Sequence, residues 1–452
     1  MKRQDLTQGS IYGNIFSFAT PYVLAYFLQI LYGLADLFFI GLYCDVDSTT
    51  AVSNGAQVMY FITCVTIGLA MGTTVRTARA IGGKDDKKVA RTVGNSITLF
   101  ACFCVIVMAT ALSLRNEIIG IMDTPHEAAA GMNSYMTICF LGMPFIMAYN
   151  VIAAIFRGMG DSKSPMIFVA IACGVNIVLD YLFIGLLGWG ASGAALGTTL
   201  SQMTSVTIAI IAIRKHRSMF QMTWNDLKPH RITTVSILKT GIPIALQDGF
   251  IQITFLAITV IANGRGLYDA AAVGIVEKFI GLVFIVPSAM LAAVSAISSQ
   301  NIGANLPERA QSTMWRAMTI TTAYGLAVSV ILQFVPEVAV RIFTSDANVI
   351  ELGSQYLRGY VWDCAFAGIH FCFSGYLTAC GYAIMSFAHN FISAICARIP
   401  LAYLASELYP DTLFPMGLAT CVGSVLSCVI CLAFYIWLKK RKARDENKAD
   451  RH

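Results

Sequence analysis

Two aspartates lie inside long apolar stretches of this 452-residue chain, where a charged side chain is costly. Asp36 and Asp180 each fall in a run of residues long enough to cross about 30 Å of hydrocarbon. A carboxylate at that depth costs about 2.5–3.5 kcal/mol on insertion scales, so its presence indicates a functional site. Two carboxylates suit either a hard cation that takes oxygen ligands or a pair of carboxyl groups that takes up a proton.

Neighbouring polar residues extend this candidate site. Asn176 lies one helical turn before Asp180 on the same face, and Thr198 lies about 12 Å into the next apolar segment. With alternating segment directions, all of these side chains fall in the outer half of the bilayer. We therefore expect Asp36, Asn176, Asp180 and Thr198 to form one site, which would be a metal site only if the ion is sodium. The alternative is that they cap helices or fix packing.

The first apolar segment carries further polar groups in line with Asp36. Gln29 and Tyr32 form a polar stripe with it. Pro21 lies in the same segment and can bend a helix, which would move Asp36. We expect these residues to support coupling, although Pro21 can equally mark a static kink.

The second half of the chain has its own costly residues, namely Asp248, Glu277, Asp363 and Arg398. Both aspartates fall near mid-membrane. Arg398 can neutralise either Asp248 or Asp363 in an internal ion pair. Alternatively, one of these carboxylates attracts a cationic substrate. The sequence leaves both interpretations open.

The elements that must position these residues are apolar helices. Hydrophobic residues make up 57% of the chain and charged residues only 12%, against roughly 25% charged in soluble proteins. The few charges are clustered between long apolar stretches, which predicts an all-α integral membrane protein. We expect twelve transmembrane helices, at 15–43, 50–78, 92–113, 131–156, 165–187, 190–213, 236–262, 270–299, 316–335, 350–379, 383–405 and 412–438.

The basic residues orient these helices. With both termini in the cytoplasm, 25 of the 31 basic residues lie on the inner side and four on the outer side. The net charge of +6 then reflects topology and the anionic inner leaflet, and it does not indicate a nucleic-acid partner. The first apolar stretch is too long for a cleavable signal peptide. These features predict a multi-pass protein of the inner (plasma) membrane.

Residues recur along the chain at a nearly constant spacing. Pro21 and Pro243 are 222 residues apart, and Gly160 and Gly381 are 221 apart. Six helices in each half make the repeat parallel, a plan typical of secondary transporters. We place an N-lobe at 1–215, a cytoplasmic linker at 216–235 with a short interfacial helix at 224–227, a C-lobe at 236–440 and a basic tail at 441–452.

Several motifs carry a family resemblance. They are Pro21…Gln29…Asp36, the segments 80–84 and 175–181, the glycine- and alanine-rich stretch 190–198, and the segment 300–304. Over nearly its whole length the sequence resembles the MATE (multidrug and toxic compound extrusion) transporters. It looks closer to the bacterial branch with N-lobe carboxylates. Asp363 departs from the family's C-lobe cation pattern, because Gly359 stands where that pattern has a tyrosine.

The resemblance implies export of amphipathic, often cationic compounds in exchange for sodium or protons. It maps the family's N-lobe cation and proton cluster onto Asp36, Asn176, Asp180 and Thr198. We expect a monomeric antiporter that works by alternating access, without a cofactor. The sequence does not decide between sodium and proton, and it does not name the substrate.

Two other functions compete with antiport. A flippase for lipid-linked sugars or peptidoglycan precursors would favour a strongly basic cavity, but only Lys278 and Arg398 are intramembrane bases, beside at least four carboxylates. A membrane-embedded enzyme would need a catalytic motif, and the sequence has neither HExxH nor a nucleophile elbow with His and Asp partners. We therefore expect a transporter and not an enzyme.

Overall fold

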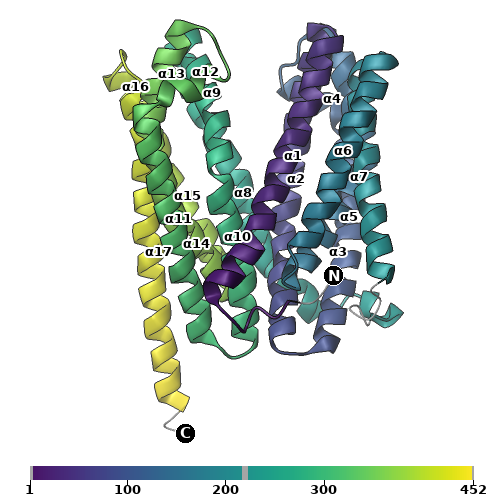
Figure 1. The fold of residues 1–452 in the computed structure, drawn as a ribbon, viewed down its shortest axis with the longest axis vertical. Helices are drawn as coiled ribbons and strands as arrows, with labels where there is room; N and C mark the ends of the chain where they lie inside the picture. The colour runs from purple at the N-terminus through teal and green to yellow at the C-terminus, as the bar shows by residue number, and fades with distance from the viewer. Residues whose placement is uncertain (1–3, 216–221, 450–452) are drawn as a thin grey trace. The chain divides into compact units, whose positions relative to one another are not determined.

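The computed structural model describes residues 4–215 and 222–449, and their side chains as far as Arg441. Lys2, Arg3, Arg217 and Arg451 of the predicted inner basic set lie outside the described residues, as do the side chains of the tail beyond Arg441. The chain forms two compact units (Figure 1). The first unit comprises the described residues up to Thr7 and Ser17–Ala245, and the second comprises Gln8–Phe16 and the chain from Leu246 onward.

The first unit contains six long helical segments and two short elements. The long segments are α1 (Ile11–Tyr43), which belongs to this unit from Ser17 onward, α2 (Val46–Gly82), α3 (Asp86–Ser113), α5 (His126–Gly158), α6 (Lys163–Asp180) with the π-helical turn η1 (Tyr181–Leu186), and α7 (Gly190–Lys215). The short elements are α4 (Arg115–Ile121) and the 3-10 helix η3 (Trp224–Leu227). The first part of α8 (Arg231–Arg265) also belongs to this unit.

Small residues bring the helices of the first unit together. A Cβ atom on Gly142 of α5 would lie 2.5 Å from Thr199 of α7, and one on Gly158 would lie 2.6 Å from Thr77 of α2. Such close approach is typical of membrane helices, where packing replaces the hydrophobic effect between helices. Large apolar side chains such as Phe38 and Ile106 are instead exposed, each by 64%. This pattern is the one expected of a surface that faces lipid.

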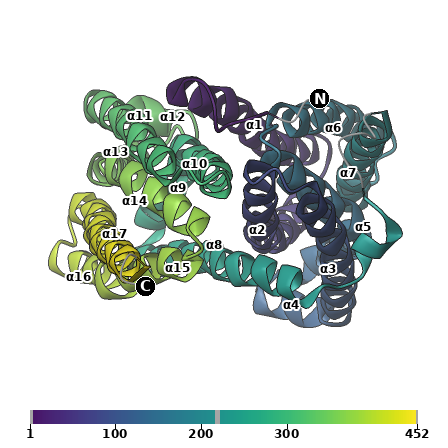
Figure 2. The ribbon, with the colours of Figure 1, turned by 90° about the horizontal axis from the view of Figure 1, so that it is seen from below.

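The second unit is also a helical bundle (Figure 2). After the remainder of α8 it contains α9 (Leu267–Val283), α10 (Ile285–Gly303), α11 (Pro307–Phe334), α12 (Pro336–Arg341), α13 (Ala347–Tyr360), α14 (Asp363–Ala379), α15 (Ala383–Ser393), the π-helical turn η4 (Ala394–Arg398), α16 (Ile399–Leu408) and α17 (Phe414–Ala449). Helix α14 packs against α10, α11 and α17. Asp363, the first residue of α14, is fully buried among these helices.

The described residues include eleven helical segments long and apolar enough to cross a membrane. The one predicted segment that is not among these eleven is the tenth, 350–379, which is divided into α13 and α14 by a turn at Val361 and Trp362. There the backbone N–H of Cys364 donates to the carbonyl of Val361 at 3.0 Å. This bond spans three residues, as in a 3-10 helix, instead of the four of an α-helix. The predicted all-α, twelve-helix architecture is confirmed, with a break directly before Asp363.

Several helices extend beyond the apolar stretches that predict them. Helix α3 begins at Asp86, six residues before the predicted start, because Asp85 caps it by accepting a bond from the Lys88 backbone N–H at 3.0 Å. That bond lowers the pKa of the Asp85 carboxyl. Polar helix ends of this kind are invisible to a hydropathy criterion.

The described part of the predicted linker is bound to α3. The predicted short helix at 224–227 is present as η3 and has a capping box between Thr223 and Asp226. The buried Asn95 side chain donates to the carbonyls of Asp226 (3.0 Å) and Lys228 (3.2 Å) and accepts from the His230 N–H (2.6 Å). The lobe boundaries drawn from the sequence stay a prediction, since the first unit of the structure continues to Ala245.

Candidate functional site

Asp36 is held by polar groups from two other helices of the first unit. Its side chain is only 5% exposed. The Asn176 side-chain amide of α6 donates to its Oδ1 at 3.0 Å, and the Thr198 hydroxyl of α7 donates to its Oδ2 at 2.9 Å. Helices α1, α6 and α7 therefore meet at this carboxylate.

Asp180 completes the predicted group of four. It is fully buried beside the Asp36 carboxyl group, at the point where α6 gives way to the π-helical turn η1. In the part of the chain that the structure describes, neither of its carboxylate oxygens has a hydrogen-bonding partner of ordinary geometry. Gly197 makes room for it, since a Cβ there would lie 2.3 Å from Asp180 Oδ1. π-Helical turns occur frequently at functional sites.

No positive side chain of the described residues compensates these two carboxylates. Among the described residues, neither Asp36 nor Asp180 takes part in an ion pair. The Oδ1 atom of Asn176 is also buried and without a partner. Burying charge without a counter-charge is strongly unfavourable, so the site is built to receive a cation or a proton. Within the described part of the chain no group of three or more His, Cys, Asp or Glu could hold a metal ion, so carboxylate, amide and hydroxyl oxygens are the only ligands here.

The supporting residues on α1 occupy different surroundings. The Tyr32 hydroxyl donates to the Thr198 carbonyl at 2.8 Å and lies 2.8 Å from the Ser201 hydroxyl. Gln29 lies further along α1 and lines a small cavity with Tyr149. Helix α1 continues through Pro21. Tyr32 thus ties α1 to α7 next to the carboxylates.

Sequence reasoning missed two neighbours of this site. Ser201 follows Thr198 by one turn on α7, and this spacing could have indicated it. Gly197 lies in the glycine- and alanine-rich stretch of the family resemblance, but its contact with Asp180 gave no signal because it depends on where Asp180 points.

In the second unit the structure pairs Arg398 with Asp363. The guanidinium Nη2 lies 3.0 Å from Asp363 Oδ2 and 3.3 Å from the Ser424 hydroxyl. Asp363 is fully buried and opens α14, while Arg398 ends the π-helical turn η4. Two local irregularities of the helices therefore bring this pair together.

The other predicted acidic residues of the second unit are arranged differently. Glu277 accepts a bond of 3.4 Å from the Thr259 hydroxyl, has one buried oxygen without a partner, and interacts electrostatically with Arg398. Asp248 is partly buried and has no hydrogen bond or ion pair to any described residue. The structure thus brings Glu277, Asp363 and Arg398 together and leaves Asp248 apart from them.

Histidines lie next to this pair. The Ser424 hydroxyl that contacts Arg398 also lies 3.4 Å from His370 Nε2. His389, whose ring centre is 5.6 Å from that of His370, lies 2.7 Å from the Ser374 hydroxyl. Ser424 and His389 are polar neighbours that sequence reasoning did not single out.

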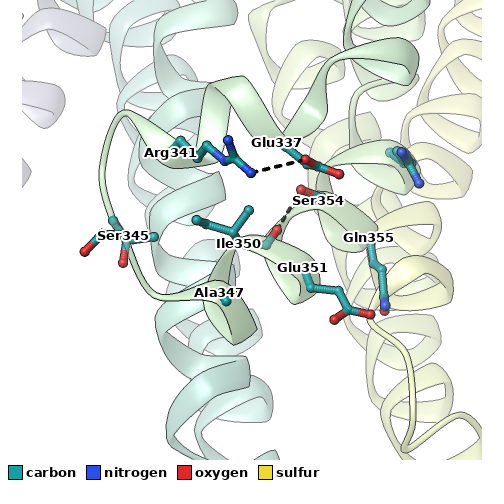
Figure 3. A pocket seen from close by; sticks show the side chains of 10 residues that line it. Glu337, Arg341, Ser345, Ala347, Ile350, Glu351, Ser354 and Gln355 are labelled. Carbon is teal, nitrogen blue, oxygen red and sulfur yellow. Dashed lines mark hydrogen bonds and ion pairs between the residues drawn. The ribbon is translucent and has the colours of Figure 1, made fainter.

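A separate groove of about 770 Å³ lies where α12 and α13 meet (Figure 3). Arg341 and Glu337 form an ion pair of 3.7 Å on its wall, and both side chains are more than half exposed. None of the predicted site residues lines this groove. It is therefore distinct from the buried carboxylates.

Comparison with known proteins identifies the family. The MatE family model matches residues 21–182 and 243–404. The chain belongs to the MatE family. The two matched segments begin 222 residues apart, the same spacing that separates Pro21 from Pro243, so the predicted internal repeat is confirmed.

Similar proteins cover almost the whole chain of this MatE protein. The probable multidrug resistance protein YpnP of Bacillus subtilis is 26% identical over 96% of both chains. The probable multidrug resistance protein NorM of Thermotoga maritima is 27% identical over 91% of this chain and 90% of its own.

Solved structures share the fold. A MATE protein crystallised in a straight conformation has a TM-score of 0.89 at 24% identity, with 99% of each chain covered. A MOP superfamily transporter from Pyrococcus furiosus has a TM-score of 0.88 at 23% identity, with 98% of each chain covered. The two-lobe, all-helical fold class is thereby confirmed. As a member of a family of multidrug efflux transporters, the chain is a membrane transporter and not an enzyme.

Proposed function

We propose that this MatE transporter exports small amphipathic, often cationic compounds in exchange for a sodium ion or a proton that moves inward. The observation that carries the proposal is the buried group of Asp36, Asn176, Asp180 and Thr198, in which two carboxylates have no positive partner among the described residues. The related proteins named for multidrug resistance support an amphipathic small molecule as the cargo.

The arrangement fits either ion. Sodium would find the four carboxylate oxygens, the unpartnered Oδ1 of Asn176 and the Thr198 hydroxyl, all of which are hard oxygen ligands. A proton would be shared by the two adjacent carboxyl groups. In both cases loading removes negative charge from the interior of the first unit.

Coupling follows from the helices that carry the ligands. Asp36 lies on α1, and its partners lie on α6 and α7. Ion loading changes the charge that Asn176 and Thr198 bind, so it changes how firmly α1 is held against the other two helices. Pro21 weakens the backbone of α1, and a bend there would transmit the change. Loading would in this way favour release of the compound.

The flippase alternative has less support. A pyrophosphate-linked lipid needs several free basic groups inside the membrane. Arg398 is paired with Asp363, which leaves only Lys278 of the two intramembrane bases expected from the sequence. We propose a monomeric protein of the plasma membrane with both termini in the cytoplasm, consistent with the bacterial relatives and with the distribution of basic residues.

The direct test is export from proteoliposomes that contain the full chain. Asp36→Asn and Asp180→Asn should abolish gradient-driven export of a cationic dye, whereas Asp45→Asn, at an exposed aspartate after α1, should retain it. A sodium gradient and a pH gradient, imposed separately, identify the ion. Undiminished gradient-driven export by both carboxylate variants would refute the proposal.

A further inference from the structure

One face of α1 is polar from the Asp36 site to the other half of the helix. Tyr22, Tyr26, Gln29, Tyr32 and Asp36 follow one another at spacings of three or four residues, so they lie on one face of the helix. The stripe is about 21 Å long at 1.5 Å per residue. In a helix that crosses a bilayer, such a continuous polar stripe is expensive and calls for a function.

A second polar stripe follows on α7. Thr198, Ser201 and Ser205 are spaced by three and four residues, and both serines are almost completely buried. The Tyr32 hydroxyl contacts the Thr198 carbonyl and the Ser201 hydroxyl, so the two stripes touch there. The Ser205 hydroxyl has no hydrogen-bonding partner among the described residues.

The stripe on α1 ends in a polar cavity inside the first unit. The cavity has a volume of about 20 Å³, enough for about one water molecule. The polar residues that line it are Tyr22, Tyr26, Gln29, Tyr149, Asn150, Arg157 and Ser162. The Ser162 hydroxyl is 3% exposed and has no protein partner, so it presents an unsatisfied polar group to this space.

Arg157 lines the cavity on the side that the proposed topology places at the cytoplasm. Its guanidinium lies 5.2 Å from the ring centre of Tyr22, a cation–π contact. Ser162 directly precedes α6, which begins at Lys163 on the same side.

We propose that this polar column is the route by which a proton passes between the Asp36–Asp180 site and the cytoplasm, within the first unit. The proposal rests on the proposed function and deepens it, because it selects the proton as the coupling ion. Hydroxyl groups and a cavity for one water suit a relay of protons. They do not offer the several oxygen ligands that a dehydrated sodium ion needs.

The transfer is balanced at every step. An O–H bond of a carboxyl group breaks, and the proton passes to a neighbouring hydroxyl or water oxygen. That oxygen releases its own proton to the next hydroxyl or water of the column, and water must bridge the carboxyl groups to Tyr32 and Ser201, whose hydroxyls contact the Thr198 carbonyl. One proton leaves the site and one enters the cytoplasm, and each hydroxyl ends as it began.

The test uses the full chain in proteoliposomes with a trapped pH dye and an exported cationic dye. Gln29→Leu and Ser205→Ala should slow substrate-coupled proton flux about tenfold, the effect of one lost hydrogen bond to a charged species. Ser205→Thr keeps the hydroxyl and should preserve the flux. The matched control is Ser134→Ala, at an exposed serine of α5. The affinity of each variant for the dye in detergent should stay within about twofold of that of the unmodified protein. A tenfold change in affinity would correspond to about 1.4 kcal/mol.

The outcomes separate the two proposals. Proton flux of Gln29→Leu and Ser205→Ala equal to that of the Ser134→Ala control would overturn the route, even if Asp36→Asn abolishes export. Full coupled export by Asp36→Asn would overturn the proposed function itself. Export by the unmodified protein that follows a sodium gradient and ignores a pH gradient would overturn the proton route alone. Equal loss in Ser205→Ala and Ser205→Thr would likewise count against it, since packing rather than the hydroxyl would be responsible.

Discussion

The Thr198 hydroxyl donates a hydrogen bond of 2.9 Å to the Asp36 carboxylate, although 162 residues separate the two along the chain. The bond joins α7 to α1 inside the first unit. Donation uses the hydroxyl hydrogen and leaves both lone pairs of the oxygen available for an ion. Thr198 can therefore both orient the carboxylate and contribute a ligand.

Removing this hydroxyl should weaken ion binding without unfolding the protein. Thr198→Val keeps the shape of the side chain and loses a bond to a charged group, which is worth about 1.5–3 kcal/mol. We expect the ion concentration for half-maximal export to rise about tenfold or more. Thr198→Ser should remain near the unmodified value. The exposed Thr207 of α7 supplies the control, Thr207→Val, and an equal rise in that variant would contradict the assigned role.

A methyl group at Gly197 should displace the second carboxylate. The added Cβ would lie 2.3 Å from Asp180 Oδ1, so the Asp180 side chain must move. We expect Gly197→Ala to insert normally but to lose most gradient-driven export, measured as dye efflux at equal protein level. Gly174→Ala on α6 is the matched control, because nothing lies within 4 Å of a Cβ there. Normal export by Gly197→Ala would show that the Asp180 position is not critical.

Much of this site can be predicted from the sequence, because the depth of a residue in the membrane and its spacing from other residues on a helix both follow from its position along the chain. The position of Asp36 in its segment and the four-residue spacing of Asn176 and Asp180 predict their grouping, and the structure places them together. The contact of Tyr32 with Ser201 depends on how α1 and α7 are rotated against each other. Hydropathy carries no information on that rotation.

In the second unit, backbone irregularities are likewise not predictable from hydropathy. The stretch 350–379 contains no proline, so its sequence gives no direct signal for the turn at Val361. The choice of Asp363 over Asp248 as the partner of Arg398 follows from that turn and from the π-helical turn η4. Both arise from tertiary packing, which overrides the local pattern.

The Arg398–Asp363 pair should respond differently to single and double substitution. Arg398→Gln leaves the fully buried Asp363 without its counter-charge, and breaking a buried pair in this way costs about 3–5 kcal/mol. The double variant Arg398→Gln with Asp363→Asn removes both charges and should recover most of the thermal stability in detergent. Arg341→Gln, which removes an exposed pair with Glu337, should change stability by less than about 1 kcal/mol. If the double variant is no more stable than Arg398→Gln, the pair is not a structural unit.

Helices α13 and α17 pack closely at two glycines, so the direction in which Gly→Ala shifts the unfolding temperature tests this packing. A Cβ on Gly417 would lie 2.3 Å from the Tyr356 carbonyl oxygen, and one on Gly359 would lie 2.4 Å from that of Phe414. Glycine costs about 1 kcal/mol relative to alanine in a helix, so Gly→Ala normally stabilises. At Gly417 the backbone of α13 cannot yield, and we expect Gly417→Ala to lower the unfolding temperature.

Gly264 of α8 is the matched control for that variant. Nothing lies within 4 Å of a Cβ there, so Gly264→Ala should leave the unfolding temperature unchanged or raise it slightly. Thermal unfolding of the two purified variants in the same detergent measures the difference. Opposite shifts would establish that the approach of α13 and α17 depends on a missing side chain. Equal upward shifts would mean that the helices can separate at no cost, and that the glycines reflect helix propensity alone.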